Sequence, residues 1–222
     1  MQKQQIEALN KLKTRKEACP ELIAYLPSTL PDTLHNKILD FLEPLGIDTR
    51  EWTPPASDVI KFVRKVNAEW DEEGGYFRPS DSEYRRDEEW IIHWLKAGDF
   101  VQKACFDRTG RALKEHIQRL KDVLPGKNVI IVLEGLAGLS AKAVNARNRR
   151  FDAAARSNLG NVSRMNKEDP LLDFQVEDVE MGLIEIQLMH EIRIVQTVNF
   201  DDSAEWISIL ATDIASIPYK YA

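Results

Sequence analysis

Two hydrophobic patterns recur along the chain: a helical spacing of three and four positions, and short apolar runs that predict strands. Apolar residues three and four positions apart place their side chains on one side of a helix. Residues 109–125 show this spacing most clearly, with Leu113, Ile117, Leu120 and Leu124 on one face. The same criterion, with a thinner apolar stripe in the first segment, predicts helices at 2–17, 32–46, 98–106, 176–191 and 201–217.

Runs of apolar and β-branched residues predict strands between these helices. Residues 128–136 read NVIIVLEGL and are expected to form a buried strand. Residues 20–27 form a short run bounded by two prolines, which favours the edge of a sheet. The polar stretch 71–87 is expected to be a turn or loop. Further strands are expected at 58–71, 90–95 and 192–199.

The order of these elements predicts a layered α/β domain over residues 1–222. Residues 140–174 interrupt the pattern, because they are rich in Ala, Asn and Arg and show little apolar periodicity. Long segments of this kind in compact domains are commonly functional or disordered. We therefore expect a long basic insertion that is helical in part and mobile in part.

The composition, the net charge and the cysteine content limit the kinds of protein to which the chain can belong. Of the 222 residues, 43% are hydrophobic, which is enough for a substantial core, and no apolar run is long enough to span a bilayer. The net charge of −6 means that affinity for nucleic acid must come from a local patch. Cys19 and Cys105 show no metal-ligand spacing, which fits a reducing intracellular compartment.

Three carboxylates near the expected strand ends are candidates for a divalent-metal site. Hydrolysis assisted by Mg²⁺ needs at least two carboxylates that converge on the ion, and Asp58, Asp99 and Glu134 are the candidates. Arg64 and Lys65, in the strand at 58–71, would repel a cation unless they are paired. A surface or capping role is therefore favoured for the three acids, with a displaced metallonuclease site as the alternative.

A cluster of cations lies in the insertion. Lys142, Arg147, Arg149 and Arg150 are accompanied by one acid, Asp152. Clustered cations neutralise backbone phosphates and release counterions, so this segment is a candidate DNA-contacting arm, with a solvated loop as the alternative. It lacks the aromatic interleaving that supports base stacking, so sequence-specific readout is not expected.

Two of the expected helices carry more apolar residues than one core face requires. Ile184 in the segment 176–191, and Trp206, Ile207 and Leu210 in the last helix, are the candidates for a partner surface. Aromatic side chains such as Trp206 often dominate the energy of an interface. Burial of both sides of each helix within the domain is the alternative.

Several stretches resemble a known family, the non-catalytic subunit of the XPF-type crossover-junction endonuclease. This is the essential meiotic endonuclease subunit in its fungal form. The most specific stretch is SAEWISILATDIASIPYK at the end of the chain, and LNKLKTRKEACPELIAYLP, IKFVRKVNAEWD and NVIIVLEGL are also similar. The likeness covers nearly the whole chain. It implies a restriction-endonuclease-like α/β domain with a central mixed sheet flanked by helices.

The resemblance also implies partners. Members of this nuclear family pair with a catalytic paralogue that uses Mg²⁺ to cut branched DNA, including flaps, forks and nicked junctions. The family further has a disordered region before this domain and a helix-hairpin-helix region after it, neither of which we find in these 222 residues.

The resemblance implies that the metal site is lost in this chain. Catalytic relatives carry Glu-Arg-Lys at a strand–helix junction and an Asp in the first core strand. Trp94 and Leu95 stand in place of the Glu and the Arg, whereas Lys96 matches the Lys. The Asp is missing from IKFVRKV. The chain is therefore expected to bind no metal or other cofactor.

The leading hypothesis from the sequence is a pseudo-nuclease domain that binds the catalytic paralogue and helps to position branched DNA. Its exposed apolar helices are expected to favour self-association when the partner is missing. An active metal-dependent nuclease and a protein-only scaffold are the alternatives.

Overall fold

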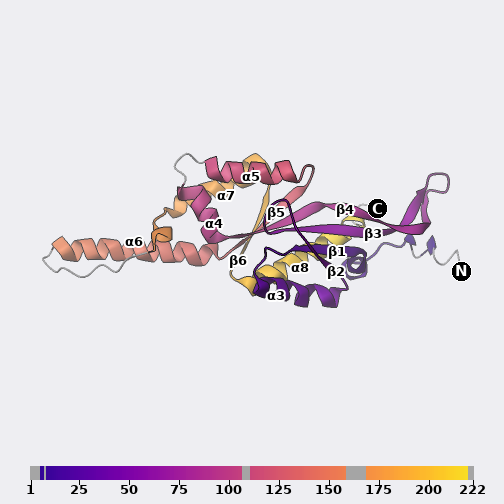
Figure 1. Cartoon of the computed structure of the whole chain (residues 1–222), viewed down its shortest axis with the longest axis horizontal. Coiled ribbons are helices and arrows are strands. Elements are labelled where there is room, and N and C mark those ends of the chain that lie inside the picture. The colour runs from indigo at the N-terminus through magenta and orange to yellow at the C-terminus, as the bar shows by residue number, and fades with distance from the viewer. Residues whose placement is uncertain (1–5, 8, 107–110, 159–168, 220–222) are drawn as a thin grey trace. The chain divides into compact units, whose positions relative to one another are not determined.

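A computed structural model describes residues 6–7, 9–106, 111–158 and 169–219 of the chain (Figure 1). The chain divides into two compact units. Unit 1 contains Met1–His93 and Ala204–Ala222, and unit 2 contains Trp94–Ser203.

Unit 1 is built on a mixed sheet with the strand order β2-β1-β3-β4. Strand β1 (Leu22–Pro27) pairs in parallel with β2 (Asp48–Trp52) and antiparallel with β3 (Val59–Asp71). Strand β3 pairs antiparallel with β4 (Tyr76–Lys96). The segment Asp48–Trp52 was not expected to be a strand, because four of its five residues are exposed and it has no apolar run.

Strand β1 lies inside the sheet, so the prediction of an edge strand is wrong. It has a partner on each side, and Leu22, Ile23 and Ala24 are fully buried. A strand covered on both faces is apolar along its whole length rather than alternating. The two prolines do not interrupt the ladder, because Pro20 precedes β1 and Pro27 is its last residue.

Strand β4 is much longer than expected, and the loop predicted at 71–87 is wrong. Residues 76–87 pair with β3, and the turn between the two strands is confined to residues 72–75. Because β1 reaches only as far as Arg64, the part of the hairpin beyond it is a two-stranded ribbon (Figure 1). Most of its side chains are exposed, so its sequence shows no apolar alternation.

Two helices pack in unit 1 as the spacing predicted. Helix α3 (Asp32–Leu42) buries Leu34, Ile38 and Leu42 and is followed by Gly46 with φ of +72°. Helix α8 (Phe200–Ser216) continues from unit 2 into unit 1. The helix expected at 2–17 is mostly not formed in its described part, where the regular helix is the four-residue α2 (Arg15–Ala18).

Among its described residues, unit 2 contains two parallel strands and four helices in full, together with the end of β4 and the start of α8. Strand β5 (Asn128–Glu134) is buried from Val129 to Leu133 and pairs with β6 (Arg193–Thr197). The expected helix at 98–106 is α4 (Ala97–Val101) with a π-helical turn at Gln102–Phe106. The other helices are α5 (Arg111–Val123), α6 (Leu136–Asn158) and α7 (Val176–His190).

The basic insertion is largely helical where it is described. Helix α6 covers most of its first half, and a short 3₁₀ turn follows at Pro170–Leu172. Residues 159–168, where part of the predicted mobile segment falls, lie outside the described residues. The expected mixed α/β fold, with helices beside the strands, is confirmed. Among the described helices, none is long and apolar enough to cross a membrane.

Candidate functional site

Glu134, at the carboxyl end of β5, is bonded to hydroxyl groups. The Ser203 hydroxyl donates to Glu134 Oε2 at 3.0 Å, and the Ser203 and Thr197 hydroxyl oxygens are 2.7 Å apart. Burial raises the pKa of Glu134, and the hydrogen bond from Ser203 and the charge of Lys96 offset part of this rise. The carboxylate therefore connects β5 and β6 to the first turn of α8.

The strand–helix junction carries aromatic, aliphatic and cationic side chains. Strand β4 ends at Lys96 and α4 begins at the next residue, as the sequence predicted. Trp94 and Leu95 are buried, and the Lys96 ammonium lies 5.7 Å from the centre of the Trp94 ring. Asp99 is in the first turn of α4, where a carboxylate complements the helix dipole. This arrangement favours packing and capping over metal binding.

The three acids proposed for a metal site do not form one in the described part of the chain. Asp58 belongs to unit 1, where its backbone has φ of +58° and its N–H donates to the Thr29 hydroxyl at 3.0 Å. Asp99 and Glu134 belong to unit 2. Among the described residues, no group of three or more His, Cys, Asp or Glu side chains is arranged to hold a metal ion.

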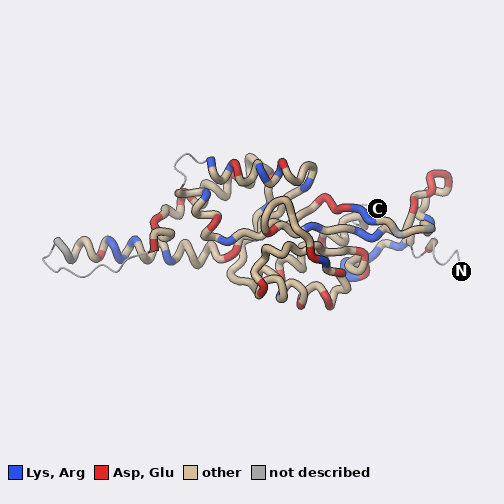
Figure 2. Tube along the Cα trace, viewed as in Figure 1, with Lys and Arg blue, Asp and Glu red and all other residues tan. Residues whose placement is uncertain are grey.

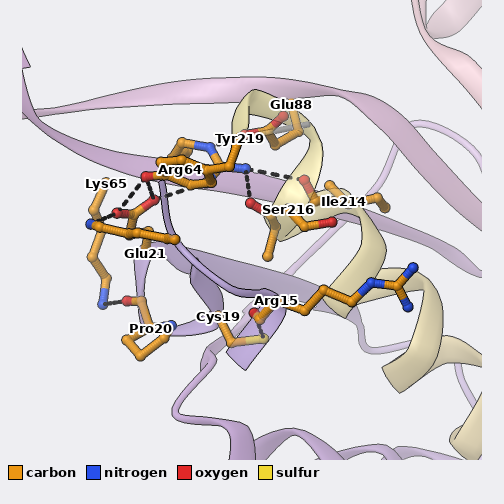
Figure 3. Close-up of polar contacts among 12 residues, drawn as sticks. Arg15, Cys19, Pro20, Glu21, Arg64, Lys65, Glu88, Ile214, Ser216 and Tyr219 are labelled. Carbon is orange, nitrogen blue, oxygen red and sulfur yellow. Dashed lines mark hydrogen bonds and ion pairs between the residues drawn. The ribbon is translucent and has the colours of Figure 1, made fainter. Parts of the chain in front are cut away.

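Arg64 is the centre of a buried ion-pair network that the sequence did not reveal (Figure 3). Its Nε donates to Glu88 Oε1 at 2.5 Å, and its Nη1 donates to Glu21 Oε2 at 3.0 Å. Its Nη2 donates to the carbonyl oxygens of Ile214 and Ala215 at 3.1 and 3.0 Å. Arg64 is 4% exposed. The guanidinium thus joins β3 and β4 to the carboxyl end of α8.

A bulge in β4 brings Glu88 into this network. Lys61 pairs with Ile91 and Val63 pairs with Asp87, so three residues of β4 lie between these pairs where β3 has one. Bulges of this kind redirect side chains locally, and Glu88 is buried as a result.

Glu21 is shared between several donors. Besides Arg64, it forms an ion pair with Lys13 and accepts hydrogen bonds from the Tyr219 hydroxyl at 2.8 and 2.7 Å. Burial and the bond to Glu21 raise the pKa of Tyr219 above its usual range. Glu21 and Glu88 therefore both contact the guanidinium of Arg64.

The residues from 28 to 210 match the ERCC4 domain, which is more than half of the chain. The chain belongs to the ERCC4 domain family. It is 24% identical over 221 residues to the crossover junction endonuclease eme1 of Schizosaccharomyces pombe, covering 97% of this chain and 29% of that protein. It is 22% identical over 219 residues to the crossover junction endonuclease EME1 of Kluyveromyces lactis, covering 93% of this chain and 31% of that protein. The chain spans less than a third of the length of these relatives.

Solved structures of XPF from Aeropyrum pernix are also similar to this ERCC4 domain. One aligns with a TM-score of 0.46 at 14% identity and covers 90% of this chain and 66% of that chain. A complex of the same protein with DNA aligns with a TM-score of 0.43 at 15% identity and covers 88% of this chain and 66% of that chain. Both TM-scores are below 0.5, so the family assignment depends on the domain match.

In this ERCC4 domain, the four predicted DNA-contacting cations lie on α6, where Figure 2 shows several basic positions, and they differ in exposure and in contacts. Lys142 and Arg149 are exposed and lie seven positions apart, which is about two helical turns and so the same side. Arg147 donates to Gln175 at 2.6 Å, and Arg150 pairs with Asp173 at 2.5 Å. These two contacts hold the segment after the 3₁₀ turn against α6, beside a pocket of about 380 Å³.

On α7, the predicted partner residue Ile184 is exposed together with two apolar neighbours. Met181 and Leu188 lie three positions before it and four positions after it, and Leu188 is 73% exposed. The spacing puts all three on one side of the helix. These three exposed apolar residues are called the α7 face.

On α8, the predicted partner residues differ in exposure. Trp206 is 38% exposed, Leu210 is half-buried, and Ile207 is 0% exposed. Ile207 thus packs in the core of unit 1, and Trp206 provides most of the surface of this set.

The shifted pKa of His116, on α5, is expected to make the stability of the fold depend on pH. Burial, together with the charges of Lys103 and Arg119, lowers its pKa to about 4, whereas Asp99 acts in the opposite direction. In the unfolded chain His116 has the ordinary histidine pKa of about 6.5. Between about pH 6.5 and pH 4, His116 is therefore protonated in the unfolded chain and neutral in the folded chain. Stability should fall as the pH falls through this window. His116 is partly exposed, so solvent screens part of the effect. In His116→Gln, we expect the free energy of unfolding to fall by about 1–2 kcal/mol less over this pH range than in the unchanged chain.

Urea denaturation of both proteins at about pH 7 and about pH 4.5 measures this difference. Equal losses in His116→Gln and in the unchanged chain would show that His116 does not carry the effect.

Proposed function

We propose that this ERCC4 domain is part of the non-catalytic subunit of a heterodimeric, structure-selective DNA endonuclease that acts in the nucleus. It binds a catalytic paralogue and helps to position branched DNA such as flaps, forks and nicked Holliday junctions during repair and recombination. Mg²⁺ and the hydrolytic site belong to the paralogue. The names of the two curated relatives, both crossover junction endonucleases, support this proposal.

The observation that carries the proposal is the state of three carboxylates that are partly or fully buried. Glu134 is bonded to Ser203, whereas Glu21 and Glu88 are paired with Arg64, and Glu21 is paired with Lys13 as well. Metal-assisted hydrolysis needs carboxylates that converge on an open coordination site. These three carboxylates instead hold elements of the fold together, which suits a subunit that contributes surfaces and not hydrolysis.

Two surfaces provide the binding functions. The α7 face, in unit 2, is exposed and apolar, as at the centre of many protein interfaces. Trp206, in unit 1, is a separate exposed aromatic residue that suits the same kind of contact. The side of α6 with Lys142 and Arg149 is exposed and basic, which suits DNA phosphates. We assign the first surface to the catalytic paralogue and the second to DNA.

The α6 assignment predicts a specific salt dependence. Each neutralised phosphate of duplex DNA contributes about −0.9 to the slope of log K against log [salt], so Lys142 and Arg149 should contribute about −2. We expect the double variant Lys142→Glu/Arg149→Glu to flatten the slope by about this amount. Fluorescence anisotropy with a labelled nicked junction over a range of salt concentrations measures the slope.

Arg147→Ala/Arg150→Ala is the matched control, because both arginines come from the same helix and contact Gln175 and Asp173. It should change the slope by less than the first variant does. If Lys142→Glu/Arg149→Glu leaves the slope unchanged, this side of α6 does not contact DNA.

A further inference from the structure

A groove of about 440 Å³ lies in unit 1 beside the β3–β4 ribbon. Four parts of the chain line it: residues 9–13, Glu21, strands β3 and β4, and Pro218–Tyr219. Asn10 attaches residues 9–13 to β4, because its side-chain amide donates to the Phe77 carbonyl at 2.7 Å and accepts from the Phe77 N–H at 2.8 Å. Specific hydrogen bonds therefore define one wall of the groove.

Aromatic rings line the groove and remain accessible to solvent. Trp70 is 53% exposed, and Phe77 and Tyr84 are also exposed. The rings of Trp70 and Phe77 meet edge to face, with their centroids 5.0 Å apart. Aromatic side chains held in this way offer flat surfaces on which planar ligands can stack.

Positive charge dominates the ionisable part of the lining. Arg86 is exposed and has no ion pair among the described residues. Lys11 and Lys65 are in exposed or partly exposed pairs with Glu17 and Asp48, and such pairs are weak enough to exchange for another anion. The charged side chains of the lining are Lys11, Lys13, Arg64, Lys65, Arg86 and the carboxylate of Glu21.

The strand register pairs two arginines at the groove, because Arg86 lies opposite Arg64. Like charges directly opposite each other on antiparallel strands are destabilising. Glu21 and Glu88 pair with Arg64 and compensate its charge, so Arg86 is the member of this pair that remains available to an anionic ligand.

We propose that this groove binds an unpaired DNA strand, whose bases stack on Trp70 and Tyr84 and whose phosphates contact Arg86 and Lys11. Accessible rings next to cations are the combination that binds single strands without sequence preference. An acidic peptide would use the cations but would leave the rings without a planar partner. The assignment rests on the proposed role in DNA processing, but it uses different residues from α6.

The ribbon also limits where the strand can lie. Its tip is acidic (Figure 2), because Asp71 ends β3 and Glu72 and Glu73 lie in the turn. These carboxylates repel phosphates. The strand therefore contacts the groove-lining part of the ribbon and not the tip.

An oligothymidylate of about ten nucleotides is a suitable probe, because single-strand sites of this size are common. We expect Trp70→Ala and Tyr84→Ala each to weaken its binding about ten-fold, and Arg86→Glu to weaken it by a similar factor at low salt. Fluorescence anisotropy gives the affinities, and thermal denaturation shows whether each variant remains folded.

Arg85→Glu is the matched control, because Arg85 neighbours Arg86 on β4 and is outside the groove lining. It should change oligothymidylate affinity by less than about two-fold. Equal weakening by Arg85→Glu and Arg86→Glu would overturn the assignment, because it would show a general charge effect. Competition by oligoglutamate as effective as that by oligothymidylate, with no effect of Trp70→Ala, would assign the groove to an acidic protein instead.

The groove assignment can fail while the proposed function holds, and the two results can be told apart. Lys142→Glu/Arg149→Glu should keep its affinity for oligothymidylate, because neither residue lines the groove. If the chain binds nicked junctions through α6 but does not bind oligothymidylate, the groove assignment is wrong and the proposed function stands.

Discussion

Replacing Arg64 with Ala is expected to lower the free energy of unfolding by about 3–5 kcal/mol. The substitution would leave the buried Glu88 carboxylate without its guanidinium and would remove the donors to the Ile214 and Ala215 carbonyls. A buried carboxylate that loses its partner bears the full cost of desolvation. The last turn of α8 would also lose a cap on its free carbonyl oxygens. Urea denaturation followed by circular dichroism measures the change.

Lys65→Ala is the control for the loss of a cation from the same strand. Lys65 forms a pair with Asp48 at 2.7 Å, and more than half of the Asp48 side chain is exposed. Such pairs contribute about 0–1 kcal/mol. Arg64→Lys should be intermediate, because an ammonium cannot contact both carboxylates and both carbonyls with the geometry of the planar guanidinium. If Arg64→Ala costs no more than Lys65→Ala, the network does not stabilise unit 1.

The sequence predicted best those elements that are buried on a regular face. Strand β5 and helix α5 have uninterrupted apolar patterns, and the structure confirms both. The far part of β4 has no such pattern, because it is exposed on both faces and is defined by pairing with β3. Its aromatic residues, including Tyr84, could have been taken as a strand signal, but Gly, Pro and charged residues between them favoured a loop.

The candidate site could be predicted only in part. The sequence suggested that Glu134 has a structural role, but the hydrogen bond from Ser203 depends on how α8 begins, which the pattern does not contain. Glu21 and Glu88 are separated from Arg64 by 43 and 24 positions, and a bulge places Glu88 inward. A charged residue inside the apolar run VIKFVRKV was the available signal that Arg64 needed buried acidic partners.

The largest expected effect on binding concerns the α7 face. Ile184→Glu/Leu188→Glu should weaken capture of the catalytic paralogue at least about 100-fold, because two carboxylates would be buried in the contact without partners. Both side chains are exposed in the chain by itself, so the variant should fold normally. Size-exclusion chromatography and calorimetric titration with the purified paralogue measure the loss, and cleavage of a nicked junction by the mixture should fall with it.

Met189→Glu is the matched control, because Met189 is exposed on the same helix but lies roughly 100° around it from the centre of the α7 face. Retained binding by Met189→Glu together with loss by the double variant would place the paralogue on that face. Glu134→Gln provides a second control, since its hydrogen bond to Ser203 gives it a structural role in the complex. A complex that assembles with Glu134→Gln but no longer cuts DNA would mean that this subunit contributes to hydrolysis, contrary to its proposed role.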